Sequence, residues 1–384
     1  MPTTRLKNAV YRAMLPFCAP DCGRHPIAGM SGHDLTTLSS FEHLIRKHHI
    51  LGSATLISSG GESSLVITSS DSPARSAVPD TFFRVASITK MATAALALRL
   101  SDLGLLQLDR PVSLLFPDSI VRDALNGITL RHLLSHMSGI VDPPGLEASL
   151  EAGIPFSDIL PAARQYQPGH SFHYSNLGFG LIGSVMEQVL SKPVGAVFSE
   201  YLFSLLNMNA TLEGCLLPPD KIMPVIRILP YRKNNEIVLT RLGSVPLTEP
   251  DPVRHYGHTA GSLYTDIHSL YILLQMLMIN QNHFLSDKTL FDMKRKHSEY
   301  GRLSPTLSYG LGLLRIEDRR LSDNVIYGHQ GFAYGCADGA FWEERSGRVM
   351  ITLNGGCSEA RVGRLGLANR DLLFWAFRKE LPLW

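Results

Sequence analysis

Residues 82–93 read Phe-Phe-Arg-Val-Ala-Ser-Ile-Thr-Lys-Met-Ala-Thr. Residues 91–100, which continue this stretch, are Ala, Leu, Met and Arg with one Thr, and most of them are strong helix formers. Ser87 and Lys90 stand at the head of this run, three residues apart. The spacing predicts that the serine hydroxyl and the lysine amine lie one above the other on the same helical face.

The Ser87–Lys90 pair has a chemical use. A serine hydroxyl keeps its proton at neutral pH, but a buried lysine can lose its own proton through desolvation and neighbouring positive groups, and then acts as a base. The helix N-terminus adds backbone donors where a substrate oxygen gains negative charge. A Ser-x-x-Lys pair also occurs by chance on the order of once in a chain of this length. Taken alone, it is better explained as a helix-capping serine and a surface lysine.

Composition limits the class of protein. The 384 residues leave room for two domains, or for one large one, with a sizeable core. Hydrophobic residues make up 45% and charged residues 18%, which is typical of a globular protein and excludes a largely disordered one. The formal net charge of +2 is too small to indicate a nucleic-acid partner, so we expect no nucleic-acid binding.

Cysteines and apolar runs limit the location of the protein. Five cysteines are too few for a disulfide framework. Cys18 and Cys22 have no second pair to complete a zinc site, and we expect them to be reduced or incidental. No apolar run approaches the roughly 18 residues needed to span a bilayer. Arg12 interrupts the N-terminal apolar stretch before a secretory signal can form, so we expect a cytoplasmic protein without membrane contact.

The residues before the Ser-x-x-Lys pair predict an extension, a helix and a hairpin. Residues 1–36 are rich in Pro, Gly, Cys and His and are expected to form an N-terminal extension over the surface. Apolar residues recur at helical spacing in 37–49, which predicts an amphipathic helix. Residues 52–59 and 63–68 are β-rich runs separated by two glycines, the pattern of a hairpin.

The residues after the pair form a helical middle and a β-rich end. Residues 101–254 are expected to be mainly helical, with helices at 130–134, 176–190 and 194–206 and short strands at 222–228 and 237–242. Next we expect a helix within 261–280, strands at 310–316, 325–327, 337–342 and 349–353, and a helix at 369–379. This order predicts an α+β fold. Its antiparallel sheet, flanked by helices, is built from residues 37–100 and 255–384, with the mainly helical domain inserted.

Two further segments carry chemistry. Tyr174 and Asn176 lie in a polar loop just before a predicted helix. A phenol near a lysine ammonium can have its pKa lowered and share the duty of general base and acid. The Asn supplies a donor and an acceptor that can fix a substrate amide or the lysine amine.

The last segment is His329-Gln330-Gly331, which follows the predicted strand at 325–327. A glycine here lets a substrate approach the strand edge, where a backbone N–H can stabilise an oxyanion. His255-Tyr256-Gly257 spells the same pattern, but no strand flanks it, so we favour His329.

Together these segments resemble the family of serine β-lactamases and penicillin-recognising peptidases, in the branch of class C β-lactamases, esterases and D-amino-acid peptidases. The resemblance covers most of the chain from about residue 37. Five landmarks occur in the family's order: 83–90 (Phe-Arg-Val-Ala-Ser-Ile-Thr-Lys), 130–139 (Leu-Arg-His-Leu-Leu-Ser-His-Met-Ser-Gly), 168–176 (Pro-Gly-His-Ser-Phe-His-Tyr-Ser-Asn), 260–265 (Ala-Gly-Ser-Leu-Tyr-Thr) and 328–331 (Gly-His-Gln-Gly). One such motif is weak, whereas five in order are a strong signal. The implied fold is the α/β sandwich of the serine β-lactamase/transpeptidase type.

The resemblance also implies roles for residues. Ser87 would be the acylated nucleophile and Lys90 its activating partner. Tyr174 would be the general base and acid, and Asn176 would orient the substrate and Lys90. No cofactor and no metal are implied.

Around residue 330 the sequence departs from the family. His329 and Gly331 would stand where many relatives have Lys-Thr-Gly, and the oxyanion hole would be the backbone N–H groups of Ser87 and Phe332. An imidazole is only partly charged near neutral pH. Gln330 replaces a hydroxyl residue that helps hold the substrate carboxylate in β-lactamases and carboxypeptidases. Both changes weaken carboxylate recognition at that end of the site.

The implied reaction is acyl transfer to Ser87, followed by attack of water or another acceptor on the acyl-enzyme. The departures favour a serine hydrolase of small ester, amide or peptide substrates over an efficient β-lactamase. Three alternatives remain open. They are a β-lactamase or D,D-peptidase, an acyltransferase that uses the same residues, and a catalytically silent binding or sensor protein.

Three other patterns are weaker indications of function. His132 and His136 lie four residues apart on a predicted helix, but Leu133 stands where a metalloprotease needs Glu, so a structural role is favoured. Residues 178–183 spell the dinucleotide fingerprint, but no strand precedes them, so we interpret these glycines as close helix packing. The lack of a strict Gly-x-Ser-x-Gly counts against an α/β-hydrolase triad.

Overall fold

The structure is a computed structural model of the 384-residue chain. It describes residues 35–59, 62–68, 77–228, 236–237, 245–301, 304–358 and 364–378, with short N-terminal pieces at 6, 9–11, 13–15, 17 and 26–27. Most of the predicted N-terminal extension, including Cys18 and Cys22, lies outside the described residues, as do the glycines between the hairpin strands.

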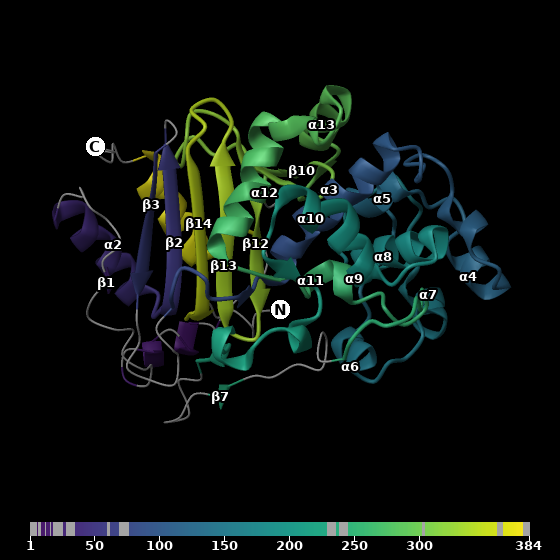
Figure 1. The fold of residues 1–384 in the computed structure, drawn as a ribbon, viewed down its shortest axis with the longest axis horizontal. Helices are drawn as coiled ribbons and strands as arrows, with labels where there is room; N and C mark the ends of the chain where they lie inside the picture. Colours follow the sequence, from purple (N-terminus) through teal and green to yellow (C-terminus); the bar gives the residue numbers. More distant parts are fainter. Residues whose placement is uncertain are drawn as a thin grey trace.

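An antiparallel sheet forms one half of the molecule (Figure 1). Its strand order among the described residues is β1-β3-β2-β14-β13-β12-β11-β10-β9. The strands span Pro26–Ile27 (β1), Leu51–Ser59 (β2), Glu62–Thr68 (β3), Ser298–Glu299 (β9), Leu307–Tyr309 (β10), Leu314–Ile316 (β11), Ile326–Ala333 (β12), Cys336–Glu343 (β13) and Val349–Gly356 (β14). The two ends of the chain meet where β2 pairs with β14, with Val349 opposite Ser58 and Gly356 opposite Leu51.

Consecutive residues of a strand point to opposite faces of the sheet, and along the central strands both sets include apolar residues, so both faces are buried. Ala54 and Leu56 of β2 face one core, together with Ile351 of β14. Ile57, which follows Leu56, and Met350, which precedes Ile351, face the other core. The central strands therefore need a helical layer on each side.

Helices supply those layers (Figure 1). On one face α12 (Ile267–Ile279) packs against β2, β13 and β14. On the other lie α2 (Leu35–Lys47) and α14 (Leu367–Leu373), which continues as the π-helical segment Phe374–Arg378. The rings of Phe41 and Trp375 join these two helices, with centroids 5.2 Å apart. The predicted helices at 37–49 and 369–379 are thus present within the described residues.

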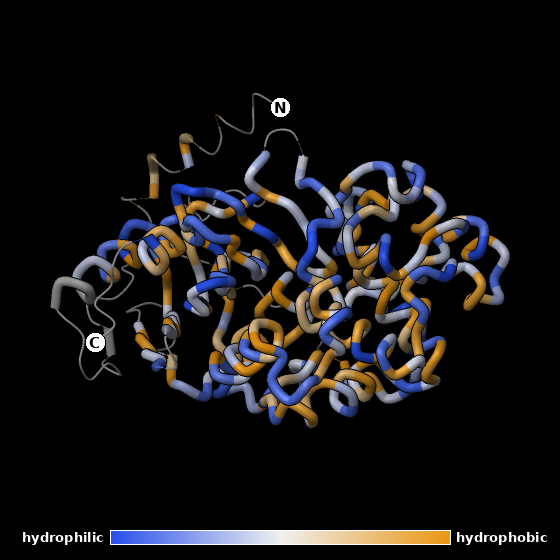
Figure 2. The backbone as a smooth tube through the Cα atoms, turned by 90° about the horizontal axis from the view of Figure 1, so that it is seen from above, coloured by the Kyte–Doolittle hydropathy of each residue, from blue (hydrophilic) through white to orange (hydrophobic). Residues whose placement is uncertain are grey.

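The other half of the molecule is mainly helical, and Figure 2 shows many of its apolar residues gathered inside. Its centre is α3 (Thr89–Asp102), which is buried on nearly every side. The other helices are α4 (Ser119–Ala124), α5 (Leu130–Leu134), α6 (Leu146–Glu151), α7 (Phe156–Ala163), α8 (Asn176–Leu190), α9 (Val194–Phe198), the π-helical Ser199–Phe203, α10 (Ser204–Leu206), α11 (His258–Gly261) and α13 (Asp287–Lys294). The predicted helices at 130–134, 176–190 and 194–206 are present.

In the part of the chain that the structure describes, two smaller sheets join short strands outside the main sheet. A three-stranded sheet joins β4 (Phe83–Arg84), β8 (Tyr264–Thr265) and β5 (Ala210–Thr211), and β6 (Ile226–Arg227) pairs with β7 (Glu236–Ile237). Within the described residues, no single helix is long and apolar enough to cross a membrane, and one bent pair, 176–190 with 194–206 at 87°, reaches the required length and composition together.

Two strand predictions were wrong in extent. The expected strand at 310–316 is a turn followed by β11, because Gly312 has φ +70° and its N–H donates to the carbonyl of Leu134 instead of a neighbouring strand. The expected strand at 222–228 is reduced to β6, and residues 238–242 of the other expected strand lie outside the described part of the chain.

The glycines of the dinucleotide-like pattern permit close packing of α8, as the sequence indicates. A Cβ atom on Gly180 would lie 1.4 Å from the Tyr256 carbonyl oxygen, and one on Gly183 would lie 2.7 Å from the Thr259 side chain. Thr93 of α3 also donates to the Thr259 carbonyl at 2.7 Å. The glycines therefore let α8 approach Tyr256 and α11 closely, and the Thr93 hydrogen bond ties α11 to α3.

We expect Gly180→Ala to lower the free energy of unfolding by about 1–3 kcal/mol, because the new methyl group collides with backbone that cannot move freely. Chemical denaturation measures the loss. The matched control is Gly261→Ala, where the nearest atom to the added Cβ is 3.8 Å away. Equal stability of the two variants would contradict this account of the α8–α11 contact.

Candidate active site

Ser87 lies in a strained turn between β4 and α3. Residues Ala86–Ile88 form a 3-10 turn, so Ser87 precedes the α-helix rather than opening it as predicted. Ala86 has φ +47°, a conformation that side-chain-bearing residues rarely adopt. Thr89 holds the turn, since its hydroxyl donates to the Ala86 carbonyl at 2.6 Å and accepts from the Leu263 N–H at 3.1 Å.

The amine of Lys90 is fully buried and surrounded by three oxygen atoms. Its Nζ lies 2.8 Å from Asn176 Oδ1, 2.7 Å from the Ala260 carbonyl oxygen and 3.0 Å from Ser87 Oγ. The first two are oxygen atoms that can only accept hydrogen bonds, whereas the serine hydroxyl can also donate. Ala260 lies on α11, which the glycines of α8 allow to pack closely against α8.

Burial lowers the pKa of Lys90 to about 7, and the charge of Asp142 opposes this shift. Desolvation penalises the ammonium form more than the neutral amine. Near neutral pH, a substantial fraction of Lys90 is therefore neutral. A neutral amine has two N–H groups, which it donates to the Asn176 and Ala260 oxygens, and its lone pair then faces Ser87 Oγ.

Tyr174 lies beside this pair. Its ring centroid lies 5.0 Å from Lys90 Nζ. The expected lowering of the Tyr174 pKa is wrong: burial raises this pKa well above the ordinary value, and the interaction with the Ser87 side chain only partly opposes the rise. Since the amine lies over the ring face and is itself partly neutral, it does not compensate the desolvation of a phenolate. Tyr174 is therefore a protonated phenol.

Asp142 fixes Asn176, and the sequence analysis missed it. One carboxylate oxygen accepts from the Asn176 N–H at 2.8 Å. The other accepts from the Ser175 hydroxyl at 2.6 Å and from the Leu177 N–H at 3.0 Å. These donors form the N-terminus of α8, where a carboxylate also interacts favourably with the helix dipole. An isolated Asp 34 residues before the loop gives no sequence signal for this contact.

His136 contacts the loop that carries Tyr174 and Ser175. Its Nδ1 accepts from the Ser175 N–H at 3.1 Å, and its ring lies 4.3 Å from that of Tyr174. Burial lowers its pKa well below the ordinary value, so the ring is neutral. This placement agrees with the structural role favoured for His136. Among the described residues, no group of three or more His, Cys, Asp or Glu side chains is arranged to hold a metal ion.

His329 is expected to face the pocket, but its side chain does not line it. Its side chain is buried on β12, and its Nε2 pairs with the Tyr309 hydroxyl at 2.6 Å. Burial, together with the charge of Lys90, lowers its pKa to about 3, so the imidazole is neutral. The adjacent Gln330 is engaged elsewhere, since its amide donates to the Arg364 carbonyl and its oxygen accepts from the Gly366 N–H. Direct contact of His329 with substrate is therefore a prediction that this structure does not support.

Gly331 permits a close contact, but with the protein rather than with a substrate. A Cβ atom there would lie 2.3 Å from the Val85 carbonyl oxygen, so the glycine brings β12 against the turn that carries Ser87.

The N–H of Phe332 faces the same turn. Ala333 and Cys336 flank the two-residue turn Tyr334-Gly335 and form its hydrogen-bonded pair, so Phe332, one residue earlier, directs its N–H away from β13. β11 covers that side of β12 only at 326–328, which leaves the N–H of Phe332 toward Ala86–Ile88.

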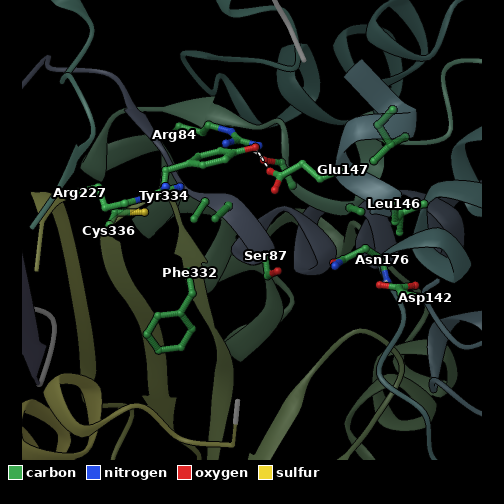
Figure 3. Close-up of a pocket in the computed structure, with 17 residues that line it drawn as sticks. Arg84, Ser87, Asp142, Leu146, Glu147, Asn176, Arg227, Phe332, Tyr334 and Cys336 are labelled. Carbon is green, nitrogen blue, oxygen red and sulfur yellow. Dashed lines mark hydrogen bonds between the residues drawn. The ribbon is translucent and has the colours of Figure 1, made fainter. Parts of the chain in front are cut away.

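A pocket of about 410 Å³ opens beside Ser87. Figure 3 shows Ser87 near its middle, with Asn176 and Asp142 on one side and Arg84, Arg227 and Tyr334 on the other. Of the residues singled out from the sequence, Ser87, Asn176 and Phe332 line the pocket. Its volume suits a small molecule.

This fold and this arrangement of serine, lysine and tyrosine are those of the penicillin-recognising serine enzymes. The profile of the Beta-lactamase family matches residues 39–355, and the chain belongs to that family. The resemblance inferred from the five motifs is thereby confirmed.

Curated relatives are distant and are matched over part of their length. Esterase EstB of Burkholderia gladioli is 28% identical over 194 residues, which are 44% of this chain and 48% of the relative. The D-alanyl-D-alanine-carboxypeptidase/endopeptidase AmpH of Escherichia coli (strain K12) is 29% identical over 141 residues, 34% of this chain and 37% of the relative. The chain thus spans half or less of the length of these relatives.

Solved structures confirm the predicted fold class. EstCE1, described as a hydrolase with promiscuous acyltransferase activity, has a TM-score of 0.68 at 20% identity and covers 88% of this chain and 97% of its own. The D-amino acid amidase from Ochrobactrum anthropi SV3 has a TM-score of 0.67 at 21% identity, with 88% of this chain and 96% of its own covered. At such identities the similarity shows the fold alone.

We expect Asp142→Ala to lower the free energy of unfolding by about 1–3 kcal/mol, because three buried or half-buried donors lose their acceptor. It should also slow labelling of Ser87 by a fluorophosphonate, since Asn176 loses its position beside Lys90. The control is Asp118→Ala, which removes the N-cap of α4 away from the pocket and should cost about 1 kcal/mol without changing labelling. Unchanged labelling in Asp142→Ala would contradict the positioning role.

Proposed function

We propose that the protein is a serine hydrolase that forms an acyl-enzyme on Ser87. The proposal rests on the environment of Lys90. Its Nζ is hydrogen-bonded to the Asn176 and Ala260 oxygens, which can only accept, and to the Ser87 hydroxyl, and burial lowers the Lys90 pKa to about 7. This arrangement turns the lysine lone pair toward the hydroxyl proton, which is what a serine needs to become a nucleophile.

In the acylation step, Ser87 Oγ attacks the substrate carbonyl carbon while its proton passes to Lys90 Nζ. The carbonyl oxygen becomes an oxyanion, which the backbone N–H groups of Ser87 and Phe332 stabilise. The carbon–leaving-group bond then breaks, and the leaving group takes a proton from the Lys90 ammonium, directly or through the Tyr174 hydroxyl. The protonated state of Tyr174 supports its role as a donor in this relay.

Deacylation uses the same groups, with water as the nucleophile and Ser87 as the leaving group. Neutral Lys90 takes a proton from a water molecule, whose oxygen attacks the acyl carbon. The second tetrahedral intermediate collapses, the carboxylic acid product leaves, and Ser87 Oγ regains the proton from Lys90. Asn176, fixed by Asp142, keeps the amine in place through both steps.

The pocket supports small ester, amide or peptide substrates. The names of the relatives (an esterase, a carboxypeptidase and a D-amino acid amidase) agree with such substrates. At the β12 end of the site, His329 is neutral and buried and Gln330 is engaged, so neither of these two residues offers a positive charge to a β-lactam carboxylate. This favours hydrolysis of simple esters or amides over efficient β-lactam hydrolysis.

Substitution of the three central residues tests the proposal. Ser87→Ala should abolish hydrolysis of p-nitrophenyl acetate, and Lys90→Met and Tyr174→Phe should each lower kcat by about 10²-fold or more, since each removes a proton-transfer group. Intact mass after fluorophosphonate treatment should show one adduct on the wild type and none on Ser87→Ala. A wild-type protein without adduct and without turnover of esters, D-amino-acid amides or penicillins would identify a catalytically silent homologue.

The pH dependence tests the role of Lys90. We expect kcat/KM for a neutral ester to rise with pH, with an apparent pKa near 7, because the neutral amine is the active form. Below that pH the amine gains a third N–H that occupies Ser87 Oγ, and the rate should fall by about tenfold per pH unit. A stopped-flow profile from pH 5.5 to 9 measures this, and a profile that is flat across the range would contradict Lys90 as the base.

A further inference from the structure

The side of the pocket opposite Asn176 contains two arginines, Arg84 and Arg227, for which the described side chains offer no carboxylate partner (Figure 3). Arg84 is only 7% exposed, and its Nε donates to the Gly261 carbonyl at 3.1 Å. Its Nη1 is buried and has no hydrogen-bond partner among the described residues. The centre of the guanidinium lies 4.9 Å from the ring centroid of Tyr334. Arg227, at the end of β6, is exposed and lines the same pocket.

A buried guanidinium of this kind normally has an anionic partner, because removing a charge from water is costly unless it is paired. The carboxylates that line the pocket already have other donors. Asp142 accepts the three hydrogen bonds at the start of α8, and Glu147 accepts one from the Tyr334 hydroxyl. Among the described residues, neither Arg84 nor Arg227 forms an ion pair with them. The buried Nη1 of Arg84 is therefore left without an acceptor from the described residues on this side of the pocket, and the exposed guanidinium of Arg227 adds a second positive charge.

The positions of the two arginines relative to Ser87 matter for the substrate. Arg84 lies three residues before Ser87, on β4, and is held by the α11 backbone. Arg227 reaches the pocket because the turn at Tyr334-Gly335 packs on β6, where a Cβ on Gly335 would lie 2.2 Å from the Ile226 carbonyl oxygen. An anion on this side would thus share the pocket with the scissile bond at Ser87, and it would enter next to Arg227, since Tyr334 covers Arg84.

We propose that this arginine side of the pocket binds a carboxylate on the substrate, so that the preferred substrates are small esters or amides that carry a free carboxylate away from the bond that is cleaved. This rests on the proposed function and adds a substrate class to it. Guanidinium groups bind carboxylates through paired hydrogen bonds, which gives both affinity and orientation. The anion site then lies across the pocket from the β12 end, where the family pattern would have placed it.

Matched substrate pairs test the proposal. One pair is p-nitrophenyl adipate monoester and p-nitrophenyl hexanoate, and the other is 3-acetoxybenzoate and 3-acetoxybenzamide, which places the carboxylate on the leaving group. We expect wild-type kcat/KM at pH 8 to be at least about tenfold higher for the charged member of one pair. That preference should fall by about tenfold in Arg227→Gln and in Arg84→Gln, and it should weaken with added salt.

The control is Arg122→Gln on α4, which makes the same change of net charge outside the pocket and should keep the preference. If Arg84→Gln does not fold, the result for the exposed Arg227 decides. A wild type without preference for either charged substrate, or a preference that persists in Arg227→Gln, overturns the proposal.

Binding without turnover separates this proposal from the proposed function. Adipate monoamide should bind Ser87→Ala by calorimetry at least about tenfold more tightly than hexanamide, and Arg227→Gln in that background should remove the difference. If hydrolysis and labelling are absent but this binding difference is present, the proposed function fails and the anion site stands. If neutral esters are hydrolysed but the binding difference is absent, the anion site fails and the proposed function stands.

Discussion

The site depends on the burial of one lysine amine. An ammonium out of water is costly, and three oxygen atoms around Lys90 only partly replace its hydration. The resulting fall in pKa lets the same contacts serve two purposes: they order the amine, and they leave its lone pair toward Ser87. Each element that approaches the amine must therefore be placed to within a fraction of an ångström.

That placement explains features that are otherwise separate. The glycines of α8 allow α11 to come close enough for the Ala260 carbonyl to reach the amine. Asp142 ties down the start of α8, which carries Asn176. Gly331 brings β12 against the Ser87 turn and so places the Phe332 N–H. Strain at Ala86 is offset by the two hydrogen bonds of Thr89, as is common where a side chain is exposed for chemistry.

The electrostatic character of the pocket differs between its two sides. On the β12 side, burial keeps His329 neutral and Tyr309 occupies its ring nitrogen. On the β4 side, Arg84 and Arg227 supply positive charge that no described carboxylate pairs. A family site whose usual cation position is neutral can thus still have a cationic side, built from different elements.

The sequence by itself determined the order and type of most elements, the family, and the identity of Ser87, Lys90, Tyr174 and Asn176 as candidates. Such features are local: helix formers, alternating strands and short motifs are read within a few residues. It did not predict the turn at Gly312, whose conformation depends on a hydrogen bond to Leu134 on a distant helix.

Only the tertiary structure decided the protonation states, the part played by Asp142 and the Ala260 carbonyl, and the burial of His329. These depend on which segments pack around each group, and a pKa depends on the solvent that such packing removes. Residues far apart in sequence, such as Lys90 and Ala260, have no local signal for one another, so neither their contact nor its effect on the amine can be read from the sequence.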